Sequence, residues 1–262
     1  MISNLTIAMI ILNIIICFIL PIIGLILLQR KYKKALFPFI LGALAFFISQ
    51  VVLRIPIINN LLPRFTWYTI FQLKYPYLYW IFLGLTAGIF EEVFRLIIIK
   101  YLMKKNYRYA DSLSFGLGHG AIEAMIITGL TYINILVFSL MINNGTFYSS
   151  LSDIDTATLN TIYNQCTSLT PLYAIIGGIE RIIAMGIHIG LTFIVFEGII
   201  KRKSIKYLLF AILIHALIDS SIGFMTNMFG LSIYIIEVIF ALISIALMFY
   251  VYKAKNHVNW QK

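Results

Sequence analysis

Ionisable side chains interrupt four long apolar stretches of this chain, and their types are those that bind metals and transfer protons. A charge at the centre of a bilayer costs at least about 2.5–3.5 kcal/mol on insertion scales, so residues of this kind require an explanation. Three of the four histidines belong to the set, whereas His257 lies in the carboxyl-terminal tail. The set consists of Glu91, Glu92, Arg95, His119, Glu123, His188, His215 and Asp219.

The positions of these residues predict that they share one pocket. Counted from the expected helix ends on the basic side, Glu91 and the three histidines all lie roughly 13–18 Å deep at about 1.5 Å per residue. His119 and Glu123 are four residues apart, as are His215 and Asp219, so each pair lies on one helix face. Four helices therefore bring carboxylates and imidazoles to a common level.

Three imidazoles from three helices could bind a zinc ion. Catalytic zinc usually takes three protein ligands and a water molecule, and neutral imidazole is one of its preferred ligands. His119, His188 and His215 are therefore the expected ligands of one zinc ion. Either Glu91 or Glu92 would take a proton from the metal-bound water, and the pattern does not choose between them. The expected reaction is hydrolysis of an amide inside the membrane.

Five further ionisable residues are expected to support this chemistry. Glu123 and Asp219 would orient the histidines, or Asp219 would itself be a ligand. Arg95 follows the glutamate pair closely enough to hold a carboxylate ionised, and it could also neutralise an oxyanion. Glu180 and Arg181 are adjacent and are expected nearer the outer side, where they would be structural or would contact the substrate.

The composition that surrounds these residues predicts an integral membrane protein. Of the 262 residues, 61% are hydrophobic and 11% are charged, against roughly 25% charged residues in ordinary soluble domains. So few charges cannot cover the surface of a soluble domain of this size. The net charge of +10 lies in short segments beside apolar runs, so nucleic acid is not an expected partner. Two cysteines do not make a disulfide framework.

Apolar runs long enough to span a bilayer, about 20 residues each, recur along the chain. They predict an all-α fold, a bundle of about seven transmembrane helices in a single domain, residues 1–262. The first run is expected to be a retained helix, because it is too long for a signal-peptide core and lacks a basic start. The expected spans are residues 5–28, 35–55, 76–103, 111–141, 171–200, 206–224 and 231–252.

Lysine and arginine residues predict the orientation of the bundle. They concentrate in alternate connections, at 30–34, 104–108 and 201–206, and in the tail. These segments are expected on the cytoplasmic side, which puts the amino terminus outside and the carboxyl terminus inside. Of the two long outer connections, 56–75 is expected to be an interfacial segment with aromatic anchors, and 142–170 to be solvated. Enrichment in Ile, Asn and Lys favours a bacterial plasma membrane.

Four ordered motifs resemble those of the YhfC family of intramembrane metalloproteases. That family is similar to the larger group that holds type II CAAX prenyl endopeptidases and bacterial abortive-infection proteins. The resemblance covers roughly residues 80–225 and implies the membrane-embedded fold and the reaction class. The motifs are Glu-Glu-Val-Phe-Arg (91–95), Gly-Leu-Gly-His-Gly-Ala-Ile-Glu-Ala (116–124), Glu-Arg-Ile-Ile-Ala-Met-Gly-Ile-His (180–188) and His-Ala-Leu-Ile-Asp (215–219).

The chain departs from the prenyl-endopeptidase pattern in one place. Two residues separate its glutamate pair from Arg95, where that pattern commonly has three, so the choice of the activating carboxylate stays open. The site residues implied by the resemblance are Glu91, Glu92, His119 or His188, His215 and Asp219.

Three functions are compatible with these patterns. The first is a zinc endopeptidase that cuts membrane-embedded or lipid-anchored substrates, with membrane lipids as its surroundings. The second is a transporter or channel for protons or divalent metals, since buried Glu, Asp and His form proton relays; however, no two halves of matching hydropathy are evident. The third is a non-catalytic receptor for a lipid or peptide. In the simplest alternative, the acid pair and Arg95 form a structural ion pair, and His119 and His215 only hydrogen-bond across helices.

Overall fold

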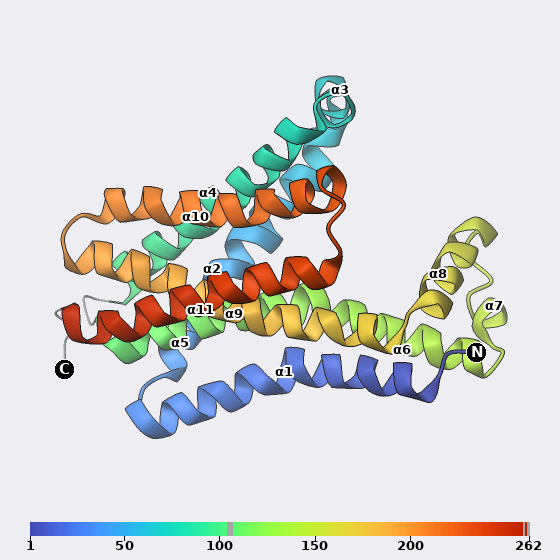
Figure 1. Ribbon diagram of the computed structural model, residues 1–262, viewed down its shortest axis with the longest axis horizontal. Helices are drawn as coiled ribbons and strands as arrows, with labels where there is room; N and C mark the ends of the chain where they lie inside the picture. Colours follow the sequence, from blue (N-terminus) through green and yellow to red (C-terminus); the bar gives the residue numbers. More distant parts are fainter. Residues whose placement is uncertain (104–106, 259, 261–262) are drawn as a thin grey trace. The chain divides into compact units, whose positions relative to one another are not determined.

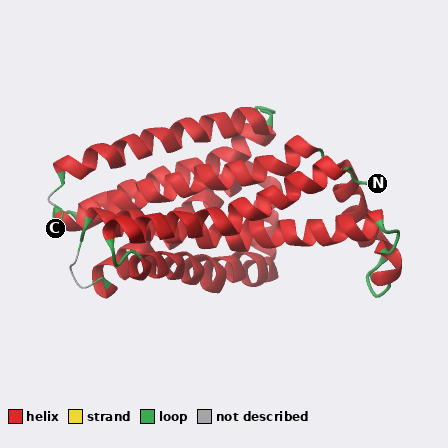
Figure 2. Cartoon of the chain, turned by 90° about the horizontal axis from the view of Figure 1, so that it is seen from below, coloured by secondary structure: helices red, strands yellow, loops and turns green. Residues whose placement is uncertain are grey.

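The computed structural model describes residues 1–103, 107–258 and 260, and all regular elements in these residues are helical (Figure 1; Figure 2). The expected all-α class is therefore confirmed. Lys104, Lys105 and Lys262, which contribute to the expected cytoplasmic charge, lie outside the described residues. The α-helices are α1 (Asn4–Tyr32), α2 (Leu36–Phe46), α3 (Thr66–Lys74), α4 (Pro76–Leu102), α5 (Tyr109–Glu123), α6 (Leu130–Asn143), α7 (Phe147–Ser150), α8 (Thr156–Ser168), α9 (Pro171–Ile200), α10 (Ser204–Gly223) and α11 (Ile233–His257).

Short segments of tighter or wider helix extend several of these elements. The π-helical segments are η1 (Phe47–Arg54), η2 (Ile57–Leu61), η4 (Ala124–Gly129) and η5 (Phe224–Met228), and η3 (Leu62–Arg64) is a 3₁₀ turn. π-helical turns are rare in proteins and occur frequently at functional sites.

Six helical stretches in the described part of the chain are long and apolar enough to cross a membrane, and they make this an integral, multi-pass membrane protein. They are Asn4–Tyr32, Leu36–Arg64, Tyr109–Asn143, Pro171–Ile200, Ser204–Met228 and Ile233–His257. The third expected span corresponds to α4, a helix of 27 residues whose glutamates, arginine and lysine reduce its apolarity. The count of seven spans and the orientation of the termini stay predictions.

The chain divides into two compact units. The site unit comprises residues 24–122 and 183–262, and the second unit comprises residues 1–23 and 123–182. Helices α1 and α9 each contribute residues to both units.

In the site unit, helices α4 and α10 pack closely because small residues line the contact. A Cβ atom added at Gly84 of α4 would lie 2.3 Å from Ser220 Oγ and 2.5 Å from the carbonyl oxygen of Ala216. Helix α5 approaches α2 in the same way, since a Cβ at Gly118 would lie 2.0 Å from the carbonyl oxygen of Phe39. Glycine is therefore required at these crossings.

Burial along α10 follows the pattern expected of a helix with one face in the bundle and one in lipid. The side chain of His215 is buried, whereas Leu213 and Leu217 are 55% and 61% exposed. The apolar core of the site unit lies beside it and includes Ile99, Phe115, Leu191 and Phe196. In water such exposed leucines would be costly, but in a bilayer they contact acyl chains.

The second unit has a smaller apolar cluster, which joins the amino terminus to α6, α7 and α8. Ile2, Ile142, Phe147, Leu159 and Cys166 form its buried part. The backbone amide of Ile2 also donates to Asn143 Oδ1 at 2.7 Å.

The two long connections contain more helix than the sequence predicts. Residues 57–64 continue the helix of the second span, and α3 follows. The segment 142–170, which is expected to be a solvated connection, contains α8. Asp155 caps the first turn of this helix, and hydrogen bonds from Thr158 keep the pKa of the Asp155 carboxyl below its usual value. A polar Thr/Asn/Gln-rich helix lacks the apolar periodicity that would reveal it.

The substitution Gly84→Ala should destabilise the protein by about 1–3 kcal/mol or more, because a methyl group there overlaps the backbone of α10. The matched control is Gly24→Ala, whose nearest neighbour is the mobile end of the Leu117 side chain at 3.0 Å. Thermal unfolding of both variants in detergent measures the difference. Equal melting temperatures for the two variants would contradict the packing described here.

Candidate metal centre

The ionisable residues predicted from the sequence gather mainly in the site unit. Helix α4 carries Glu91, Glu92 and Arg95, which are all buried. The three histidines come from three other helices, with His119 on α5, His188 on α9 and His215 on α10, and all three are buried. Four helices thus contribute to one cluster.

The three imidazoles converge on a single oxygen atom of Glu91. His119 Nε2 lies 2.8 Å from Glu91 Oε2, His215 Nε2 lies 3.8 Å from it, and His188 Nδ1 lies 3.9 Å from it. The ring centres of His119 and His188 are 4.6 Å apart, and those of His188 and His215 are 5.6 Å apart. One carboxylate oxygen therefore occupies the point at which the rings meet.

Three of these side chains have the geometry of a metal-binding group. Glu91, His119 and His188 each offer one ligand atom, and these atoms all lie within 4.8 Å of one another. Zinc bonds of about 2.1 Å in a tetrahedron require ligand atoms about 3.4 Å apart, so the donors present fit such an ion after small side-chain rotations.

Glu92 has a partner at each oxygen. His215 Nδ1 donates to Oε1 at 2.8 Å, and Arg95 Nη1 donates to Oε2 at 3.0 Å. Arg95 can reach Glu92, three residues before it, or Glu91, four residues before it, and in the structure its guanidinium pairs with Glu92. Glu92 and Arg95 have no exposed surface, so this pair is fully desolvated.

Arg95 also fixes the ring of His188. Its Nη2 lies 3.1 Å from His188 Nδ1. A guanidinium can only donate hydrogen bonds, so Nδ1 must accept. The arginine therefore links the Glu92–His215 pair to a second imidazole of the cluster.

Asp219 lies at the more open side of the cluster. Its Oδ2 is 3.7 Å from His215 Nε2, and its side chain is 37% exposed. The described part of the cluster holds the carboxylates of Glu91, Glu92 and Asp219 and the guanidinium groups of Arg95 and Arg54. Buried negative charge of this kind is usually paired or coordinates a metal.

Three predicted residues belong to the second unit, where they form their own network. Arg181 Nη1 donates to Glu123 Oε1 at 2.7 Å, and Arg181 also pairs with Glu180. Glu123, expected from its spacing to lie beside His119, is thus engaged by Arg181 on α9.

Sequence reasoning missed two residues of the cluster, Gln50 and Arg54 on η1. Gln50 Nε2 donates to Glu91 Oε1 at 2.6 Å, and Arg54 Nη1 donates to Gln50 Oε1 at 3.0 Å. A polar pair four residues apart within an apolar run was the available signal.

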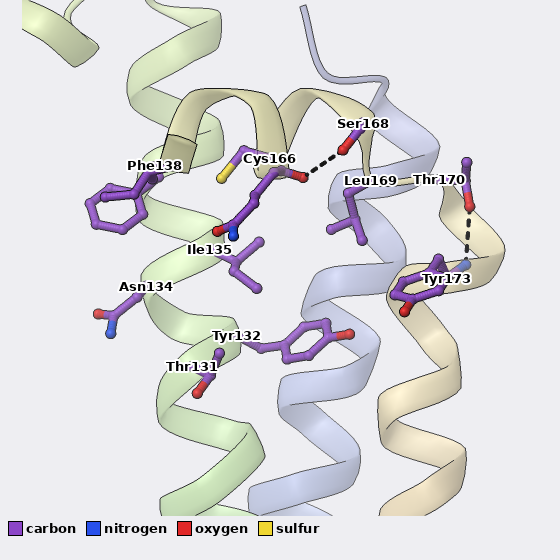
Figure 3. A pocket seen from close by; sticks show the side chains of 12 residues that line it. Thr131, Tyr132, Asn134, Ile135, Phe138, Cys166, Ser168, Leu169, Thr170 and Tyr173 are labelled. Atoms are coloured by element: carbon purple, nitrogen blue, oxygen red, sulfur yellow. Dashed lines mark hydrogen bonds between the residues drawn. The ribbon is translucent and has the colours of Figure 1, made fainter. Parts of the chain in front are cut away.

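A pocket of about 720 Å³ lies in the second unit among α6, α8 and the start of α9 (Figure 3). Tyr132, Phe138, Cys166 and Tyr173 are among its lining residues. Its described lining contains no histidine and no carboxylate, so the acid–base and metal-binding groups lie outside it.

Comparison with known proteins decides the family. A family model described as YhfC intramembrane metalloprotease matches residues 16–244. The chain belongs to the YhfC family. It is 34% identical over 248 residues to the protein named "Uncharacterized membrane protein YhfC" of Bacillus subtilis (strain 168), and the match covers 92% of this chain and 93% of that relative. No solved structure matches the chain.

Membership confirms the resemblance predicted from the four motifs. The matched region contains all the clustered residues, from Gln50 on η1 to Asp219 on α10. The description of the family gives the reaction class at the level of an intramembrane metalloprotease.

Substituting Arg95 by Met should destabilise this YhfC-family protein by about 3–5 kcal/mol, because it leaves the Glu92 carboxylate buried without its ion-pair partner. The double substitution Arg95→Met and Glu92→Gln removes the stranded charge and should recover part of this loss. The free energy of unfolding in detergent is measured for the two variants, for the wild type and for the control Arg64→Met, which replaces an exposed arginine. A single variant as stable as wild type, or a double variant less stable than the single one, would contradict the pairing.

Proposed function

We propose that this protein is a zinc-dependent intramembrane endopeptidase that hydrolyses peptide bonds of membrane-embedded or lipid-anchored substrates. The description of the family supports the reaction class. The observation that carries the proposal is the convergence of three imidazoles from three helices on Glu91 Oε2. Carboxylate and imidazole groups that are buried together are ligands that favour a divalent cation.

Glu91, His119 and His188 would hold the ion, and His188 would give up the hydrogen bond that its Nδ1 accepts from Arg95, because a neutral imidazole has one lone-pair nitrogen. One carboxylate and two imidazoles form a donor set that zinc uses in other metallopeptidases. When bound, zinc would supply Lewis acidity at the substrate carbonyl and would make water more acidic. Nε2 of His119 lies 2.8 Å from Glu91 Oε2, and to hold the ion through this nitrogen His119 would have to be deprotonated there.

We assign proton transfer to His215. Because Glu92 accepts from Nδ1, the neutral ring keeps its lone pair on Nε2, which lies 3.8 Å from Glu91 Oε2. In hydrolysis, the oxygen of a water molecule forms a bond to the peptide carbonyl carbon while Nε2 takes a proton from that water. The carbon–nitrogen bond then breaks, and Nε2 returns the proton to the leaving amine nitrogen.

The Glu92–Arg95 pair would position His215 without contacting the substrate. Arg95 keeps Glu92 ionised, and Glu92 holds the Nδ1–H group of the ring. Such a carboxylate–imidazole contact fixes both the tautomer and the orientation of a histidine. Of the two glutamates, we therefore assign Glu91 to the reaction centre, because its Oε2 lies within 2.8–3.9 Å of the three imidazoles.

The surroundings support a substrate that reaches the site through the membrane. Most of the cluster is buried among helices, and Asp219 and Arg54 are partly exposed. Leu213 and Leu217, on the same helix, are strongly exposed and would face lipid. Similarity of the YhfC family to prenyl endopeptidases adds lipid-anchored peptides to the substrate class.

The sequence predicts three histidine ligands and a glutamate base, whereas the assignment proposed here makes Glu91 a ligand and His215 the base. The zinc content of a Glu91 variant distinguishes the two assignments. If Glu91 is a ligand, Glu91→Gln should lose most of the zinc. If it is only the base, this variant should keep zinc and lose cleavage. Metal analysis of the purified variant decides between the two assignments.

The proposed function itself predicts about one zinc ion per purified chain and cleavage of transmembrane model peptides in vesicles. His119→Ala should lose both zinc and cleavage, because it removes a ligand. His215→Gln should keep zinc and lower cleavage by about 10²–10⁴-fold, the usual contribution of a general acid–base group. His257→Ala, in the tail, is the matched control and should behave as wild type. Wild-type protein that takes up no stoichiometric metal would overturn the proposal.

A further inference from the structure

The Gln50 side chain lies between a carboxylate and a guanidinium, and this fixes its orientation. Its Nε2 donates to Glu91 Oε1 at 2.6 Å, and its Oε1 accepts from Arg54 Nη1 at 3.0 Å. A carboxylate can only accept, and a guanidinium can only donate. Only one orientation of the amide satisfies both neighbours, so Arg54 determines that Gln50 presents a donor to Glu91.

Arg54 is itself held by α4, the helix that carries Glu91. Its Nε donates to Thr86 Oγ1 at 3.1 Å, and its Nη2 donates to the Leu83 carbonyl oxygen at 2.7 Å. The guanidinium therefore uses all three of its nitrogen atoms, one toward Gln50 and two toward α4. All of these residues lie in the site unit.

The wide turns of η1 place both side chains on the same neighbour. Gln50 and Arg54 are four residues apart on η1, yet both reach α4, at Glu91 and at Leu83 and Thr86. Gln50 is only 3% exposed, so its hydrogen bonds have no competition from bulk water. A desolvated hydrogen bond to a carboxylate is among the stronger ones.

We infer that Arg54 is a positioning residue that acts through Gln50 to fix the Glu91 carboxylate as a metal ligand; this inference rests on the proposed function. Gln50 holds Oε1 of Glu91, which leaves Oε2 directed at the three imidazoles. Without Arg54 nothing holds the amide oxygen of Gln50, so the side chain can move and weaken its hydrogen bond to Glu91. The hydrogen bonds of the Arg54 guanidinium go to Gln50, Thr86 and the Leu83 carbonyl oxygen.

A double-mutant cycle on metal affinity tests this chain of contacts. Zinc affinity is measured by competition with a chromophoric chelator for wild type, Gln50→Leu, Arg54→Met and the double variant, and the absorption spectrum of the cobalt-loaded proteins reports ligand geometry. Each single variant should bind zinc about 10–100-fold more weakly, the usual effect of losing a partner of a metal ligand. The double variant should bind no more weakly than Gln50→Leu, because Arg54 acts only through Gln50.

Controls separate positioning from general damage. Arg64→Met, which replaces an exposed arginine in η3, should keep the zinc affinity and the cobalt spectrum of the wild type. If Arg54→Met does not fold, as judged by gel filtration, Arg54→Lys and Thr86→Val replace it. Both should weaken zinc binding. The single ammonium of lysine cannot satisfy Gln50 and α4 together, and valine removes the hydroxyl that accepts from Arg54 Nε.

Each outcome bears on one claim or on both. Wild-type affinity in Arg54→Met, or losses that multiply in the double variant, would overturn the role of Arg54 while the proposed function stands. Wild-type protein that binds neither zinc nor cobalt would overturn the proposed function and this inference together.

Discussion

The cost of placing two adjacent glutamates in an apolar helix governs the arrangement of the site unit. Neither carboxylate on α4 can be left unpaired in a medium that solvates charge poorly. Adjacent residues on a helix point in different directions, so the two carboxylates need different partners. Glu91 is satisfied by Gln50 and His119, and Glu92 by Arg95 and His215.

These hydrogen bonds tie four separate elements to α4. The contacts come from η1, α5 and α10, and Arg95 extends the network to His188 on α9. Such short contacts require close helix approach, which glycine at positions such as Gly84 and Gly118 permits. The packing of small residues and the chemistry of the cluster are thus two parts of one arrangement: the first allows the backbone distances that the second needs.

Within this arrangement the glutamates play different parts. Glu92 has one hydrogen-bond partner at each oxygen, Arg95 and His215, and so links these two side chains. Glu91 directs Oε2 at three rings, where an ion or a proton can be received. Two glutamates that are next to each other in sequence therefore have different partners because their surroundings differ.

Much of this could be predicted from the sequence. The family, the all-helical class, the multi-pass membrane character and the bounds of α9 followed from motifs and apolar runs. The carboxylate that pairs with Arg95 could not be predicted, because side chains three residues apart and side chains four residues apart both meet on a helix. Gln50 and Arg54 escaped notice because an amide and an arginine match no motif, and their role depends on π-helical turns that apolar periodicity does not reveal.

The hydrogen bond between Arg181 and Glu123 shows a second limit of such reasoning. Glu123 shares a helix face with His119 by spacing, yet a charge on a distant segment engages it. Pair spacing within one helix predicts which residues can meet, but the partner supplied by another helix is fixed by tertiary packing.

X-ray absorption at the zinc edge of the purified protein tests the central claim most directly. The account predicts stoichiometric zinc surrounded by imidazole nitrogen and carboxylate oxygen at about 2.0–2.2 Å, with the imidazole signal reduced in His188→Ala. A spectrum of sulfur ligands, of water oxygens alone, or unchanged by loss of His188 would contradict it.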